Sequence, residues 1–184
     1  MHVLRDDSGT GFELVTMTLG WEPVRRDRWW GGAVRDIDMN AAAMLFSGDG
    51  LVDVVYHESL TSQDGSIHHL GDSITGEGPR KADDEIISVD LTRLSPQVTT
   101  VIFLVTTYTG HTFAEIDNAF CRLVDSVSAT EIARYELHGA SHTGLVMGAL
   151  RRTVDGVWEF HEIDEGIAAQ HPVDAAPLLG RYLR

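Results

Sequence analysis

Hydrophobic and polar residues alternate over short stretches of this chain, and turn residues separate the stretches. The stretches are rich in β-branched and aromatic residues, which is typical of strands rather than of amphipathic helices. The predicted strands cover residues 12–19, 33–46, 51–56, 86–91, 98–108, 119–124, 131–137, 145–152 and 157–163. This spacing resembles that of a sandwich more than a repeat of strands and helices. We therefore expect a mainly all-β fold, an antiparallel β-sandwich.

Turn chemistry supports this prediction, because Asp-Gly pairs supply the positive φ angles that tight hairpins need. Three such pairs lie between strand-like stretches: Asp49-Gly50, Asp64-Gly65 and Asp155-Gly156. Helical periodicity is scarce. It predicts only a short turn over residues 113–118 and a C-terminal helix over 172–182. Residues 2–11 are polar, so we expect a loose N-terminus.

Composition is that of an ordinary globular protein, with 43% hydrophobic and 23% charged residues in a chain of 184. That length suits one buried domain over residues 1–184, with a core at about 12–166 and a C-terminal extension at 167–184. The net charge of −14 repels nucleic acid and anionic lipid, so direct nucleic-acid binding is not expected.

The absence of membrane and signal segments and the single cysteine bear on where the protein is expected in the cell. No apolar run approaches the length of a membrane span, and the first ten residues lack the apolar core of a signal peptide. We expect a cytoplasmic protein that does not span a membrane. The single cysteine, Cys121, lies in an alternating stretch and is expected to be a small buried residue.

Two groups of acidic residues suggest a metal site. In Asp36-Ile37-Asp38-Met39-Asn40, the first, third and fifth side chains share one face if the backbone is extended. The second group combines a glycine-rich stretch, residues 71–78, with Asp83-Asp84-Glu85. Carboxylates held this close repel one another unless a cation lies between them. The two groups therefore predict a site for a divalent ion with oxygen ligands.

Calcium is the ion expected, because it takes six to eight oxygen ligands, whereas magnesium keeps most of its waters. An EF-hand is excluded, although Asp36 begins an Asp-x-Asp-x-Asn sequence. The sixth position of that loop is Ala41 instead of glycine, and the twelfth is Ser47 instead of glutamate. The alternative is that each acidic side chain is simply exposed to solvent at the surface and binds no ion.

Two other chemistries receive little support from the sequence. Gly71-Asp72-Ser73-Ile74 is similar to the nucleophile block of GDS-type esterases, but no histidine has an aspartate three residues before it to form that family's base. His138 and His142 are four residues apart, but the intervening Gly-Ala-Ser makes a poor helix for zinc binding. The histidines, including His68-His69, are expected to lie in solvent.

Aromatic residues fall into two groups. Trp29-Trp30 follow three arginines, and this patch either anchors a loop or contacts a partner or ligand. Trp158 and Phe160 share a strand face and are expected in the core.

The chain resembles the TerD-domain family of tellurium-resistance proteins, also called calcium-binding stress proteins, over residues 19–166. The specific block is the glycine-rich stretch followed by Asp83-Asp84-Glu85. The other blocks, in family order, are Leu19-Gly20-Trp21-Glu22-Pro23, Asp36-Ile37-Asp38, Asn118-Ala119-Phe120 with Arg122, and Ile132-Ala133-Arg134-Tyr135-Glu136-Leu137.

This resemblance implies a β-sandwich that binds two neighbouring calcium ions in loops at one end. Carried onto this sequence, it implies that the ligands are Asp36, Asp38, Asp72, Asp83, Asp84 and Glu85, with Ser73, Thr75, Gly76 and Gly78 adding side-chain or carbonyl oxygens.

The chain departs from the family pattern near the proposed ligands. Ser73 stands where an asparagine is usual, and Tyr56-His57 replaces a tyrosine and asparagine. Arg80 and Lys81 add positive charge before the acidic block, which weakens cation binding. These departures leave open that one of the two calcium sites is weak or empty.

The resemblance implies a non-enzymatic role in bacterial resistance to tellurite and other stresses, with other proteins of a stress-response system as partners. Two alternatives stay open. One is a metal-assisted hydrolase that uses the acidic cluster. The other is a sandwich that binds a ligand through calcium, with Trp29 and Trp30 as a stacking platform.

Overall fold

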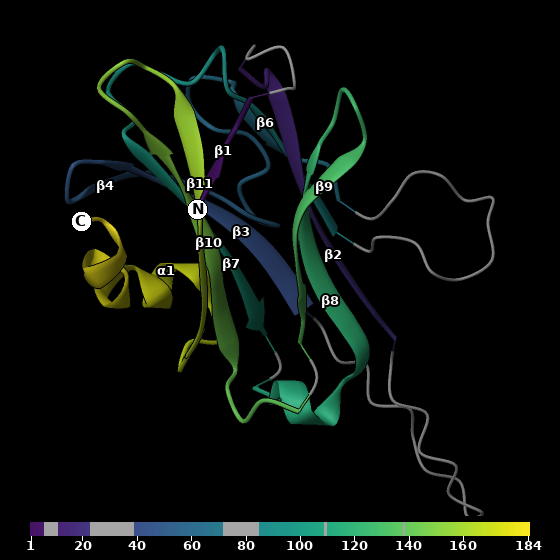
Figure 1. The fold of residues 1–184 in the computed structure, drawn as a ribbon. Coiled ribbons are helices and arrows are strands. Elements are labelled where there is room, and N and C mark those ends of the chain that lie inside the picture. Colours follow the sequence, from purple (N-terminus) through teal and green to yellow (C-terminus); the bar gives the residue numbers. More distant parts are fainter. Residues whose placement is uncertain (6–10, 23–38, 72–84, 109, 138) are drawn as a thin grey trace, which may run out of the picture.

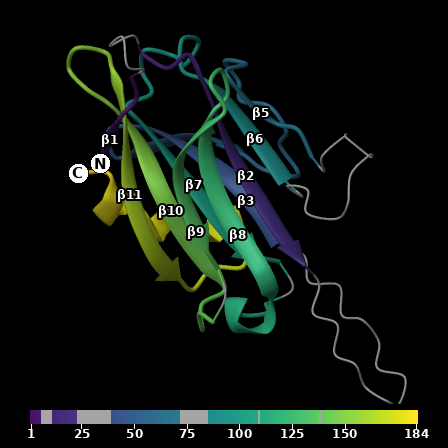
Figure 2. The same ribbon diagram turned by 45° about the vertical axis from the view of Figure 1, so that its right-hand side comes forward.

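The computed structural model describes residues 1–5, 11–22, 39–71, 85–108, 110–137 and 139–184. Within them the strands form two antiparallel sheets that face each other (Figures 1 and 2). The six-stranded sheet has the order β1-β11-β10-β7-β3-β4, and the five-stranded sheet has the order β5-β6-β2-β8-β9. The predicted β-sandwich is thus confirmed.

The strands are His2–Val3 (β1), Leu14–Glu22 (β2), Met39–Ser47 (β3), Gly50–Val55 (β4), Ile67–His69 (β5), Glu85–Asp90 (β6), Thr100–Thr107 (β7), Asp117–Asp125 (β8), Thr130–Glu136 (β9), Gly144–Arg152 (β10) and Trp158–Ile167 (β11). The helical turns are Phe113–Glu115 (η1), Pro172–Ala175 (α1), Ala176–Leu178 (η2) and Gly180–Tyr182 (η3).

Each of the nine predicted strands has a counterpart, although residues 33–38 of the second lie outside the described residues. The short strands β1 and β5 were not predicted. The expected loose N-terminus is wrong for its first residues, because β1 pairs with β11 and Leu4 is 1% exposed. The predicted C-terminal helix is present as α1 followed by two 3-10 turns, η2 and η3.

Two of the Asp-Gly predictions hold, since Gly65 and Gly156 both have a positive φ. In the β3–β4 hairpin the prediction was off by two positions. There Gly48 takes the positive φ, and Gly50 already pairs with Ser47 as the first residue of β4.

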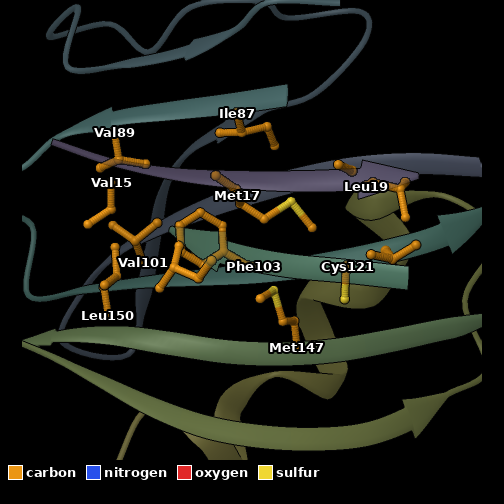
Figure 3. Close-up of a cluster of buried hydrophobic side chains, with 14 of the residues drawn as sticks. Val15, Met17, Leu19, Ile87, Val89, Val101, Phe103, Cys121, Met147 and Leu150 are labelled. Atoms are coloured by element: carbon orange, nitrogen blue, oxygen red, sulfur yellow. The ribbon is translucent and has the colours of Figure 1, made fainter. Parts of the chain in front are cut away.

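The main core lies between the sheets and follows from strand alternation. Val15, Met17 and Leu19 of β2 point inward and pack with residues of the other sheet such as Phe103 and Met147 (Figure 3). The predicted core positions of Cys121, Trp158 and Phe160 are confirmed. Burial of this apolar surface is the main favourable term in folding.

A second apolar layer covers the outer face of the six-stranded sheet. Ala175, Leu179 and Tyr182 of the C-terminal segment pack there against alternate residues of β3 and β7, including Met44 and Leu104. Figure 1 shows this segment, in yellow, against β10 and β7. Because both faces of β3 and β7 are covered, eight consecutive residues of each strand are buried, as in strands covered on both sides.

None of the helices in the described part of the chain is both long and apolar enough to cross a membrane.

Candidate metal centre

Residues 36–40 and 71–85 are the two acidic segments, and their described ends meet at one end of the sandwich. β3 starts at Met39, directly after residues 23–38, and β6 starts at Glu85, directly after residues 72–84. β6 pairs with the far end of β2 through Glu85 and Leu19, and the backbone N–H of Ala41 in β3 donates a hydrogen bond to Glu85. The fold therefore brings the start of β3 to the start of β6.

Most of the predicted ligands cannot be placed. Asp36, Asp38, Asp72, Ser73, Thr75, Gly76, Gly78, Asp83 and Asp84 lie outside the described residues, as do Trp29 and Trp30. These assignments stay predictions. Glu85 is the predicted ligand whose geometry is described.

Glu85 is buried at the boundary between the sheets. Its side chain is 10% exposed and points inward, on the same strand face as Ile87 and Val89. The oxygen Oε2 accepts the hydrogen bond from the Ala41 backbone N–H across the interface. A buried carboxylate needs such donors or a cation, because a charge without partners is costly inside a protein.

His69 is a buried neighbour of Glu85 that sequence analysis missed. Its side chain is 2% exposed, which corrects the prediction that His68-His69 lie in solvent. Its Nε2 lies 3.6 Å from Glu85 Oε2, and its Nδ1 accepts a hydrogen bond of 3.1 Å from the backbone N–H of Gly71. Gly71 has a φ of 69°, a left-handed conformation that glycine adopts without strain.

Asn40 lies away from Glu85. In β3 Met39 and Ala41 face the main core, so alternation places Asn40 on the opposite face, toward the layer that contains Ala42. Its register partner is Thr106 of β7. Asn40 Nδ2 and Thr106 Oγ1 are both buried and make no hydrogen bond within the described part of the chain. The structure thus separates the amide of the first acidic group from the carboxylate that ends the second.

The chemistry of the described residues favours a hard cation over a soft one. Glu85 supplies carboxylate oxygen, the ligand type that calcium and magnesium prefer. Burial raises the pKa of the Cys121 thiol well above its usual range, so this cysteine stays protonated and is a poor ligand for soft metals. The described residues alone contain no group of three or more His, Cys, Asp or Glu side chains arranged for a metal ion.

These features define a class of protein: an antiparallel β-sandwich in which acidic segments run into the strand ends on one side. The chain belongs to the TerD-domain family, whose model matches residues 4–171.

Relatives with known names support this assignment. The chain is 40% identical over 147 residues to tellurium resistance protein TerZ of Serratia marcescens, covering 77% of this chain and 74% of that protein. It is 34% identical to tellurium resistance protein TerD of the same organism, with 84% and 81% covered. It is also 29% identical to a stress response protein of Bacillus subtilis, with 85% and 84% covered.

A solved structure agrees with the fold. The crystal structure of a homologue of the telluride resistance protein TerD from Streptomyces coelicolor A3(2) superposes with a TM-score of 0.76 at 26% identity. The match covers 92% of this chain and 98% of that one. The chain therefore shares its family with tellurium-resistance and general stress proteins.

Proposed function

We propose that this protein is a calcium-binding, non-catalytic module of a bacterial stress response that includes resistance to tellurite. It acts in the cytoplasm through contacts with other proteins. The observation that carries the proposal is the buried Glu85 carboxylate at the point where both acidic segments join the sandwich. Family membership supports the stress-response role, because curated relatives are named for tellurium resistance and stress response.

The residues present suit calcium by their chemistry. Glu85 and the predicted aspartates Asp36, Asp38, Asp72, Asp83 and Asp84 offer carboxylate oxygens, while Ser73, Thr75, Gly76 and Gly78 offer hydroxyl or carbonyl oxygens. Calcium takes six to eight such ligands at flexible geometry. Bound there, it would neutralise the repulsion among these carboxylates and fix the segments that carry them. We infer that this ordered surface is what a partner protein contacts.

Calcium binding is tested by calorimetry and thermal unfolding on chelator-stripped protein. A ligand that binds only the folded form stabilises it by about 2.7 kcal/mol at a hundred times its dissociation constant. For a chain of this length that corresponds to a rise in Tm of about 5–10 °C. The double variant Asp83→Asn/Asp84→Asn should lose both the binding heat and the rise in Tm.

A matched control separates ligand loss from charge loss. Asp49→Asn/Asp155→Asn removes the same two charges from exposed hairpin turns and should keep the full calcium response. If stripped wild-type protein gives no heat with calcium and the same Tm in calcium and in chelator, the proposal is wrong.

A further inference from the structure

The ring of His69 contacts both described flanks of the segment 72–84. On one side its Nδ1 accepts the hydrogen bond from Gly71, the last described residue before that segment. On the other side its Nε2 lies 3.6 Å from Oε2 of Glu85, the first described residue after it. β5 holds the ring in place, because Ile67–His69 pairs with β6 in the register His69↔Ile87.

The hydrogen bond from Gly71 determines which nitrogen carries the proton. A nitrogen that accepts a hydrogen bond has no proton, so the neutral ring carries its proton on Nε2. The Nε2–H is then directed at Glu85. This tautomer leaves Nε2 without a lone pair for a metal, so His69 turns an N–H toward the carboxylate, 3.6 Å away, and is not itself a cation ligand.

The buried Nε2–H of His69 lowers the stability of the fold. Nε2 is buried and has no hydrogen-bond partner among the described residues, and 3.6 Å is too long for a hydrogen bond to Glu85. A buried donor without an acceptor costs on the order of 1–3 kcal/mol. An apolar ring of similar shape would avoid this cost. Packing against the described residues therefore gives no reason for a histidine here in place of a phenylalanine.

We propose that His69 is a positioning residue for cation binding by Glu85. This inference rests on the calcium-binding function proposed above. The two N–H groups that approach the carboxylate, from Ala41 and from His69, both face Oε2. The hydrogen bond from Ala41 holds that oxygen inside the sandwich, and the Nε2–H of His69 adds an electrostatic attraction at 3.6 Å. Oε1 is then the oxygen left for the cation. Residues that orient a ligand in this way typically contribute a factor of about 10–100 to metal affinity.

Substitutions at His69 separate this role from a structural one. His69→Phe keeps the ring shape and removes the buried Nε2–H. The variant also removes the acceptor of the Gly71 N–H, which offsets part of this gain, so we expect a Tm in chelator close to that of the wild type. The calcium dissociation constant should be about 10–100 times higher by calorimetry. A merely structural histidine would instead lower the Tm in chelator and leave the calcium affinity unchanged.

An amide pair tests the donor directly and does not depend on the phenylalanine variant. His69→Gln reaches as far as Nε2 and keeps an N–H for Glu85, so it should recover most of the affinity. His69→Asn keeps an acceptor near Gly71 but is too short to reach Glu85, so it should lose affinity as His69→Phe does. His68→Phe is the control on the same strand, since His68 contacts Thr61 and Gly65, and it should bind calcium as the wild type does.

The outcomes distinguish this inference from the proposed function. Wild-type protein that gives no calcium heat overturns both. Wild-type protein that binds calcium while His69→Phe and His69→Asn bind it equally well overturns the role of His69 and leaves the proposed function standing. Equal losses in His69→Gln and His69→Asn would show that the Nε2–H is not the group that matters.

Discussion

Asp64 shows how one carboxylate joins two loops of the sandwich. Its Oδ1 accepts hydrogen bonds from the hydroxyls of Ser62 and Ser66, at 2.7 and 2.6 Å, and its Oδ2 accepts one of 2.8 Å from the backbone N–H of Ser95. Burial alone would raise the pKa of Asp64. The hydrogen bonds from Ser66, Ser95 and Ser62 outweigh burial and lower this pKa to about 2. The ionised form therefore stabilises the fold.

We predict that Asp64→Asn lowers the free energy of unfolding by about 2 kcal/mol at pH 7, since hydrogen bonds to a charged group are the strong ones. The pKa of Asp64 is 3.8 when unfolded and about 2 when folded, so its contribution is complete above pH 3.8 and is lost as the pH falls toward 2. Urea unfolding at pH 7, 5 and 3.5 measures this. Asp155→Asn, in an exposed Asp-Gly turn, is the control. A difference that stays constant down to the acid limit would contradict the assignment.

Asp64 and Glu85 show what sequence patterns can predict and what they cannot. Asp64-Gly65 was identified as a turn because turn chemistry is local. Its bond to Ser95 was not predicted, since it joins residues 31 positions apart. Likewise Glu85 was found from an acidic motif. The contact of His69 with Glu85 depends on the register of β5 against β6, which no local pattern encodes.

At the scale of elements, the alternation of hydrophobic and polar residues predicted the strands that are long enough to show this pattern. β5 has three residues and β1 has two, so neither carries a period-two signal, and both were missed. The C-terminal segment was predicted as one helix, yet the structure divides it into α1, η2 and η3, with Pro177 near the start of η2. A proline lacks the backbone N–H that a longer α-helix would need there.

The C-terminal segment is anchored by a few side chains, and two adjacent leucines test this. Leu179 is fully buried against the outer face of the six-stranded sheet, whereas Leu178 is 42% exposed. We predict that Leu179→Ala lowers the free energy of unfolding by about 2–5 kcal/mol, the range for deleting a buried leucine side chain. Leu178→Ala should change it by less than about 0.5 kcal/mol. Urea unfolding of both variants measures this, and equal effects would argue against anchoring through Leu179.

At the scale of the whole molecule, polar contacts join the two sheets around an apolar core. At one place Glu85 of β6 accepts the hydrogen bond from Ala41 of β3. At another, the Tyr135 hydroxyl of β9 donates a 3.0 Å hydrogen bond to Glu162 of β11. Hydrogen bonds from His2 and Tyr135 lower the pKa of Glu162, so this carboxylate is held in its charged form. A glutamate side chain thus accepts the hydrogen bond at each of these two links.

The net charge of −14 makes the compact state repel itself, which predicts a response to salt that must be separated from calcium binding. Raising KCl from 0.01 to 0.15 M shortens the screening length from about 30 to about 8 Å. In chelator, this should raise the Tm, by about 2–4 °C for each kcal/mol of repulsion removed.

Calcium added at 0.15 M KCl should raise the Tm further. Bound calcium ions neutralise the carboxylates that hold them, whereas potassium ions in solution screen these charges only partly. Thermal melts with KCl or magnesium at matched ionic strength measure the difference. If KCl reproduces the full calcium effect, screening alone explains the stabilisation and the acidic segments need no bound calcium. If magnesium reproduces it, the site binds divalent ions without selecting calcium.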